Sequence, residues 1–158
     1  MCIRDRYDDQ FSFITETEEM ARDLQASAAD MNETKTRIAS VKKLFESNDG
    51  AKEFIDYGEE LSKDINEWEK LVLQPDQKTF QDVINFPNKL SAECMNLMGR
   101  MSGMIPTITD GMKERLGDLK SEYNAVKSQH KTITDKFQNY NDLFKPVSYT
   151  HLTLPTKA

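Results

Sequence analysis

The sequence predicts an all-α protein, an up-down antiparallel bundle of long helices. Over most of the chain, apolar residues recur at alternating steps of three and four, the spacing that keeps one face of a helix apolar. Hydrophobic residues make up 37% of the 158 residues and charged residues 30%, with only 6 Gly and 5 Pro. This composition favours long, solvated helices over a many-stranded sheet with tight turns. No strand pattern competes with the helical one.

The first helix is predicted over residues 8–47. Lys35 and Lys42 interrupt its apolar series. We expect it to end at Ser47-Asn48-Asp49-Gly50, with Gly50 in the left-handed conformation and Asn48 or Asp49 capping the next helix. The positions that define its buried seam are Ile14, Thr17, Ala21, Leu24, Ala28, Met31, Ile38 and Phe45.

The second helix is predicted over residues 51–72, where the three-four alternation has no fault. It ends before Pro75, which lacks an amide hydrogen and disfavours helix in the residue before it. Its seam positions are Ala51, Phe54, Gly58, Leu61, Ile65, Trp68 and Val72. The connection that follows contains too many apolar residues to remain fully solvated, so we expect it to pack on the bundle. Its apolar residues are Phe80, Val83, Ile84 and Phe86.

A third, shorter helix is predicted over residues 87–102, with Pro87 in its first turn. Its seam is formed by Leu90, Cys94, Leu97 and Met101. The fourth helix is predicted over residues 109–144, and Thr107 with Asp110 approximates a capping box at its start. Its seam has the strongest signal in the chain: Met112, Leu116, Leu119, Tyr123, Val126, His130, Ile133, Phe137, Tyr140 and Phe144.

A repeat near 3.5 residues over five heptads predicts left-handed supercoiling of the fourth helix against its neighbours. The second and third helices are each shorter than the first and the fourth. Two arrangements therefore remain open: the two short helices lie end to end in a three-layer bundle, or all four helices form separate layers.

Both ends of the chain resemble translated sequencing adapters. Residues 1–6 (MCIRDR) and 147–158 (VSYTHLTLPTKA) resemble the two strands of an adapter used in transposase-based sequencing libraries. We expect these segments to be artefacts and residues 7–146 to be one helical domain, a fragment of a longer protein. Met1 is then no true start, and the lack of a signal peptide says nothing about secretion.

Four methionines at spacing three, with Cys94 beside them, are candidate ligands of a Cu(I) site, because Cu(I) prefers soft sulfur ligands. Successive steps of three residues turn them to different sides of a helix, so we interpret Met95, Met98, Met101 and Met104 as packing residues. His130 lies in a seam without an identifiable nucleophile, and Cys94 has no cationic sequence context. We predict no catalytic, cofactor-binding or metal-ligating residue.

Paired acids, Asp8-Asp9, Glu18-Glu19 and Glu59-Glu60, point about 100° apart on a helix and are read as solvated faces. Asn32-Glu33-Thr34 matches a glycosylation acceptor within a helix, and Gly99 with Gly103 lies outside any apolar span. The net charge of −6 argues against nucleic acid as a partner. No apolar run is long enough to span a membrane.

Two stretches carry a resemblance to a known family. The first contains Trp68-Glu69, Leu73-Gln74-Pro75 and the run from Gln77 to Leu90; the second contains Pro106-Thr107, Gly111, the run from Glu114 to Leu119, and Glu122. Together they resemble the C-terminal helical region of bacterial sortilin-like proteins with BNR (Asp-box) β-propellers, often labelled glycosyl hydrolases. The likeness covers most of residues 7–145. The methionine-rich run and Cys94 depart from the aliphatic pattern expected there.

The resemblance implies an exported parent protein, periplasmic or extracellular, whose chemistry belongs to a propeller preceding the helices. No catalytic residue of the family maps onto this chain. We therefore expect a non-catalytic appendage without cofactors that braces the propeller of its own chain or docks another protein. The alternatives are a stand-alone coiled-coil module that oligomerises through its first and fourth helices, and part of a glycoside hydrolase catalytic unit.

Overall fold

The computed structural model describes residues 3–45, 49–76, 84–103 and 107–152. These residues form four α-helices and one short 3₁₀ helix, and they contain no strand. The elements are α1 (Ile3–Phe45), η1 (Asp49–Ala51), α2 (Lys52–Val72), α3 (Leu90–Met101) and α4 (Asp110–Leu152). The prediction of an all-α helical bundle is confirmed.

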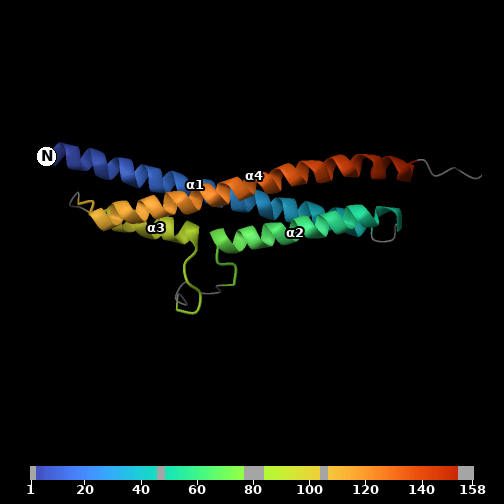
Figure 1. Ribbon diagram of the computed structural model, residues 1–158, viewed down its shortest axis with the longest axis horizontal. Helices are drawn as coiled ribbons and strands as arrows, with labels where there is room; N and C mark the ends of the chain where they lie inside the picture. Colours follow the sequence, from blue (N-terminus) through green and yellow to red (C-terminus); the bar gives the residue numbers. More distant parts are fainter. Residues whose placement is uncertain (1–2, 46–48, 77–83, 104–106, 153–158) are drawn as a thin grey trace, which may run out of the picture.

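The short helices α2 and α3 lie end to end in one layer, alongside the long helices α1 and α4 (Figure 1). Both pack against α1, and both pack against α4. The bundle therefore has three layers, the first of the two arrangements that the helix lengths left open. Because α2 and α3 together return the chain to its starting end, α1 and α4 run in the same direction (Figure 1).

The buried core follows the predicted seams. Every seam position of the second and third helices is buried, and on α1 only Ile14 is half-buried. On α4 the seam divides into two sets. Leu116, Leu119, Val126, Ile133 and Tyr140 are buried, whereas Met112, Tyr123, His130 and Phe137 are half-buried. The side chain of Phe144 lies outside the described residues.

The half-buried set on α4 follows from the spacing of the helices. Tyr123, His130 and Phe137 approach residues of α1, and α1 and α4 make fewer close backbone contacts than α1 makes with α2 or α3. The wider gap leaves these side chains partly open to water.

The two lysines that interrupt the first seam pair with acids of α2. Lys35 Nζ lies 2.6 Å from Glu69 Oε2 and 3.1 Å from Asn66 Oδ1, and Lys42 Nζ lies 2.5 Å from Glu59 Oε1. The Lys42–Glu59 pair is open to water and the Lys35–Glu69 pair is only partly buried, so solvent screening leaves both too weak to drive folding. Since they match only in one antiparallel register of α1 and α2, their effect is on alignment.

Several predicted helix ends are wrong. Helix α1 begins at Ile3 and α4 continues to Leu152, beyond the predicted residues 8 and 144, because an existing helix extends at little cost. Gly50 lies in η1, and no described glycine has a positive φ. The N-cap of α2 is Ala51, without a side-chain hydrogen bond, because η1 leads directly into α2. Asn48 lies outside the described residues.

The starts of α3 and α4 also differ from prediction. Helix α3 begins at Leu90 after an extended Lys89, so Pro87 precedes the helix. The Pro87 carbonyl accepts a 3.2 Å hydrogen bond from Gln74 Nε2, which holds it in the connection. At α4 the cap is Thr109 in place of Thr107: Thr109 Oγ1 accepts from the Met112 amide at 3.3 Å. Thr109 directly precedes the first helical residue, where a hydroxyl reaches the free amides.

The expected packing of the connection on the bundle is wrong for Ile84, whose side chain is 96% exposed. Phe86 is half-buried, and Phe80 and Val83 lie outside the described residues. Ile84 lies in the connection between α2 and α3, outside both helices, so helical periodicity does not place it on a buried face.

Replacement of glycine by valine is expected to have different effects on stability at Gly58 and at Gly117. A Cβ on Gly58 would lie 3.0 Å from Tyr140 Cε2 and 3.1 Å from Ile38 Cγ2, whereas a Cβ on Gly117 meets no atom within 4 Å. We expect Gly58→Val to lower the free energy of unfolding by about 1–3 kcal/mol through overpacking. Gly117→Val is expected to leave it unchanged or raise it by a few tenths of a kcal/mol. Urea unfolding measures both, and equal effects would refute the close packing at Gly58.

Candidate functional site

A row of polar contacts bridges α1 and α4. Acids spaced seven residues apart on α1 meet bases on α4: Glu16 pairs with Lys120 at 2.6 Å, Asp23 with Lys127 at 3.1 Å, and Asp30 Oδ2 lies 3.5 Å from His130 Nε2. Two helical turns further, the Arg37 guanidinium lies over the Phe137 ring, 5.2 Å from its centroid. The row lines the interface of α1 with α4, which is more loosely packed than those of α1 with α2 and α3, and it aligns the two parallel helices.

Tyr123 is the centre of this row. Its hydroxyl donates to Asp23 Oδ2 at 2.7 Å and accepts from Lys127 Nζ at 2.8 Å. The hydrogen bond from Tyr123 lowers the pKa of Asp23, whereas burial, with Asp23 nearby, raises the pKa of Tyr123. The tyrosine therefore keeps its proton, and this cluster fits a structural hydrogen-bond network better than a general base.

His130 and Cys94, the two candidates for nucleophilic chemistry, are not brought together. The His130 Nε2 atom is buried without a hydrogen bond, and its ring centroid lies 5.5 Å from that of Trp68. Cys94 is fully buried on α3, where burial raises its pKa to about 11, with Glu122 adding to the effect. At neutral pH the thiol stays protonated and therefore weakly nucleophilic.

The described methionines of the predicted run have different surroundings. Met101 is buried in the core, Met98 is half-buried, and Met95 is 48% exposed with its sulfur 3.6 Å from Gln25 Nε2. Met104 lies outside the described residues. Within the described ranges, no group of three or more His, Cys, Asp or Glu is placed to hold a metal ion.

The paired acids are on solvated helix faces. Asp8, Asp9 and Glu19 are exposed, Glu18 pairs with Arg22 at 2.7 Å, and Glu59 pairs with Lys42. Asn32 is exposed on α1, and Gly99 on α3 meets no neighbouring side chain. None of the helices in the described part of the chain is long and apolar enough to cross a membrane.

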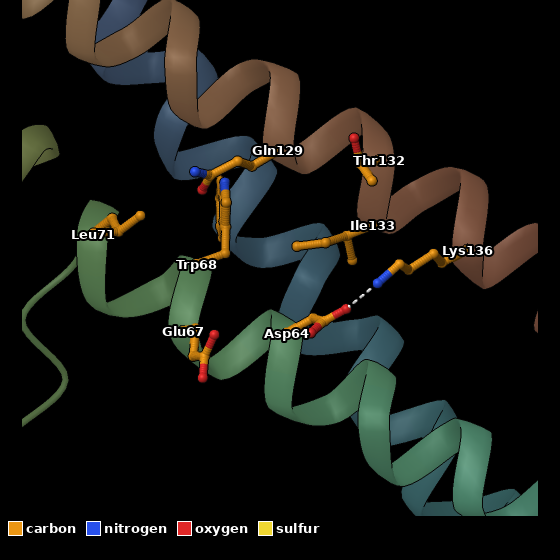
Figure 2. Close-up of a pocket in the computed structure, with 8 residues that line it drawn as sticks. All are labelled: Asp64, Glu67, Trp68, Leu71, Gln129, Thr132, Ile133 and Lys136. Carbon is orange, nitrogen blue, oxygen red and sulfur yellow. Dashed lines mark hydrogen bonds and ion pairs between the residues drawn. The ribbon is translucent and has the colours of Figure 1, made fainter.

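The feature that sequence reasoning missed is an open groove of about 440 Å³ between α2 and α4 (Figure 2). Its floor is apolar and its rims are polar. The α2 wall contributes Asp64, Glu67, Trp68 and Leu71, and the α4 wall contributes Gln129, Thr132, Ile133 and Lys136. The available signal in the sequence was Leu71, a leucine outside the seam, which is 48% exposed.

Two polar contacts hold the walls of this groove in place. Trp68 Nε1 donates a buried 2.8 Å hydrogen bond to the Val126 carbonyl of α4. Lys136 Nζ lies 2.5 Å from Asp64 Oδ2, and this contact raises the pKa of Lys136 (Figure 2). Since the groove is tied at both ends of its floor, its width is set before any ligand arrives.

The fold and this groove define the chain as an all-α, three-layer helical bundle with a partly apolar groove open between α2 and α4. Comparison with models of protein families, with characterised proteins and with solved structures finds no match.

Proposed function

We propose that this chain is a non-catalytic helical bundle that serves as a docking or bracing module. The observation that carries the proposal is the use of its ionisable groups. Ionisable side chains at the helix interfaces mostly form ion pairs across the interface: Lys35 pairs with Glu69, and Lys136 pairs with Asp64. Groups used in this way position helices, and part of the apolar surface left open lies in the groove between α2 and α4.

For the wider context, we propose the C-terminal appendage of an exported sortilin-like β-propeller protein. The support is the resemblance of the stretches around Trp68 and Leu119, both of which are core residues here. The test is the nucleotide sequence upstream of Tyr7 in an intact gene. Repeated Ser-x-Asp-x-Gly-x-x-Trp turns are expected there, and an upstream region without them would overturn the propeller context.

The competing proposal is a stand-alone coiled-coil module that oligomerises through α1 and α4. The seams of both helices are occupied within one chain, which favours a monomer. We expect size-exclusion chromatography with light scattering to give a single species near the chain mass of 18.2 kDa. A stable dimer or larger species would instead support the oligomerisation module.

The third proposal, a glycoside hydrolase unit, predicts turnover of chromogenic glycosides by this chain. We expect no turnover above a blank. A rate that is lost on Asp64→Asn or Glu67→Gln would overturn the non-catalytic assignment.

A further inference from the structure

We infer that Met95 on α3 is a site of reversible oxidation, and that the sulfoxide formed there by a peroxide accepts a hydrogen bond from Gln25 of α1. This inference goes beyond the proposed docking function and does not depend on it. The observation behind it is a contact between two helices: the Met95 sulfur lies 3.6 Å from Gln25 Nε2. A polar donor of α1 therefore faces an exposed thioether of α3.

Met95 is the most accessible methionine in the part of the chain that the structure describes. It is 48% exposed, whereas Met98 and Met112 are half-buried. The other described methionines are buried in the core: Met20, Met31 and Met101. Because a peroxide must reach the sulfur before it reacts, oxidation follows exposure. The structure therefore ranks Met95 first among these six methionines.

Small residues on α3 leave room beside the Met95 side chain. Residues three or four positions apart share a helix face, and these neighbours include Ala92 and Gly99. Ala92 is exposed, and a Cβ added to Gly99 would meet no atom within 4 Å. The adjacent Cys94 is fully buried and keeps its proton at neutral pH, so this thiol does not compete for the oxidant.

The oxidation consumes one molecule of hydrogen peroxide. A lone pair of the Met95 sulfur attacks one peroxide oxygen, and the S–O bond forms as the O–O bond breaks. The hydroxide that leaves takes the proton from the oxygen now on sulfur and becomes water. Sulfur is oxidised to the sulfoxide and the peroxide is reduced. Methionine sulfoxide reductases reverse the change by oxidising a dithiol to a disulfide and releasing the oxygen as water.

The product strengthens the contact between Met95 and Gln25. A thioether sulfur is a weak hydrogen-bond acceptor, whereas the sulfoxide group is polar and its oxygen accepts readily. Both side chains are exposed, so they can move apart to admit the oxygen. The new bond joins α1 to α3, the most closely packed pair of the described helices. Oxidation of Met31 or Met101 would instead place a polar group in the core.

The first test measures the oxidation rate of each methionine. The full chain is treated with limiting hydrogen peroxide, and peptide mapping by mass spectrometry follows the added oxygen. We expect Met95 to react about three- to tenfold faster than Met98 and Met112, and more than about tenfold faster than the three buried methionines. Met98→Leu is the matched control and should leave the Met95 rate unchanged. A rate at Met98 or Met112 equal to that at Met95 would overturn the inference.

The second test detects the hydrogen bond in the chain oxidised at Met95 alone, purified after the limiting treatment. We expect the side-chain amide signal of Gln25 to move downfield in the NMR spectrum and the melting temperature to rise by about 1–3 °C. Gln25→Leu identifies the signal and removes the donor, so oxidation of this variant should not raise its melting temperature. Gln138→Leu, at an exposed glutamine of α4, is the matched control and should keep the rise.

Two results of the second test would overturn the inference. One is an unmoved Gln25 amide signal, and the other is the same change in melting temperature for the parent chain and Gln25→Leu. Treatment with the reductases and a dithiol is expected to restore the original spectrum, and a spectrum that stays altered would refute reversibility. The proposed docking function rests on other residues and is unaffected by either result.

Discussion

Replacing Trp68 by alanine is expected to lower the free energy of unfolding by about 3–5 kcal/mol. The Trp68 ring is 2% exposed and packs between α2 and α4 beside the His130 ring. The substitution removes this buried surface, leaves a cavity, and frees the Val126 carbonyl from the indole hydrogen bond. Urea denaturation followed by circular dichroism measures the loss, since the variant has no tryptophan.

Two further variants separate packing from hydrogen bonding at this position. Trp68→Phe keeps a ring and loses the indole donor, so we expect a smaller loss of about 1–3 kcal/mol. Leu119→Ala, a fully buried seam residue of α4, is expected to cost about 2–5 kcal/mol. Leu44→Ala, at a 75% exposed leucine, should change little. Unchanged stability for both Trp68→Ala and Leu119→Ala would contradict the assigned core.

Alkaline pH is expected to destabilise the bundle through two buried groups that lose a proton at high pH, the Cys94 thiol and the Tyr140 hydroxyl. Burial raises the pKa of Cys94 from 9.0 to about 11 and that of Tyr140 from 10.0 to about 12. Both groups are neutral when protonated, so the folded state holds their protons more tightly than the unfolded state does. Their contribution is complete below pH 9, declines as the unfolded chain deprotonates, and is lost by about pH 12.

The expected size of this alkaline loss is about 2–3 kcal/mol for each group, the free-energy equivalent of raising the pKa of Cys94 from 9.0 to about 11 and that of Tyr140 from 10.0 to about 12. The raised pKa values of Lys127 and Lys136, due to their hydrogen bonds with Tyr123 and Asp64, act in the same direction above pH 10.5. Thermal melts at fixed ionic strength between pH 8 and 12 measure the decline.

The control for the alkaline effect is the double variant Tyr140→Phe with Cys94→Ala. Its stability at pH 8 falls because of the altered packing, but its decline above pH 9 should be smaller than that of the parent chain. Parallel pH curves for the two proteins would exclude these groups as the cause. Tyr140→Phe alone should keep the stacking on Phe54, whose ring centroid lies 4.3 Å away.

The candidate groove shows the limit of single-helix patterns. The seam of α2 predicted Trp68 as a core anchor, and Trp68 is buried. No pattern along α2 indicates that Gln129, Thr132 and Lys136 form the opposite wall. That juxtaposition depends on the relative register of α2 and α4, and contacts such as Lys136 with Asp64 contribute to setting it.

Local spacing was sufficient for the fold class and the core, because the period of an α-helix decides which residues share a face, whatever lies opposite. Ala51, Leu61 and Leu119 were therefore predictable as core residues. The end-to-end placement of α2 and α3, the exposure of Ile84 and the opening of the groove depend on contacts between distant segments. Such contacts arise from packing among three helices at once, and no single stretch of sequence contains that information.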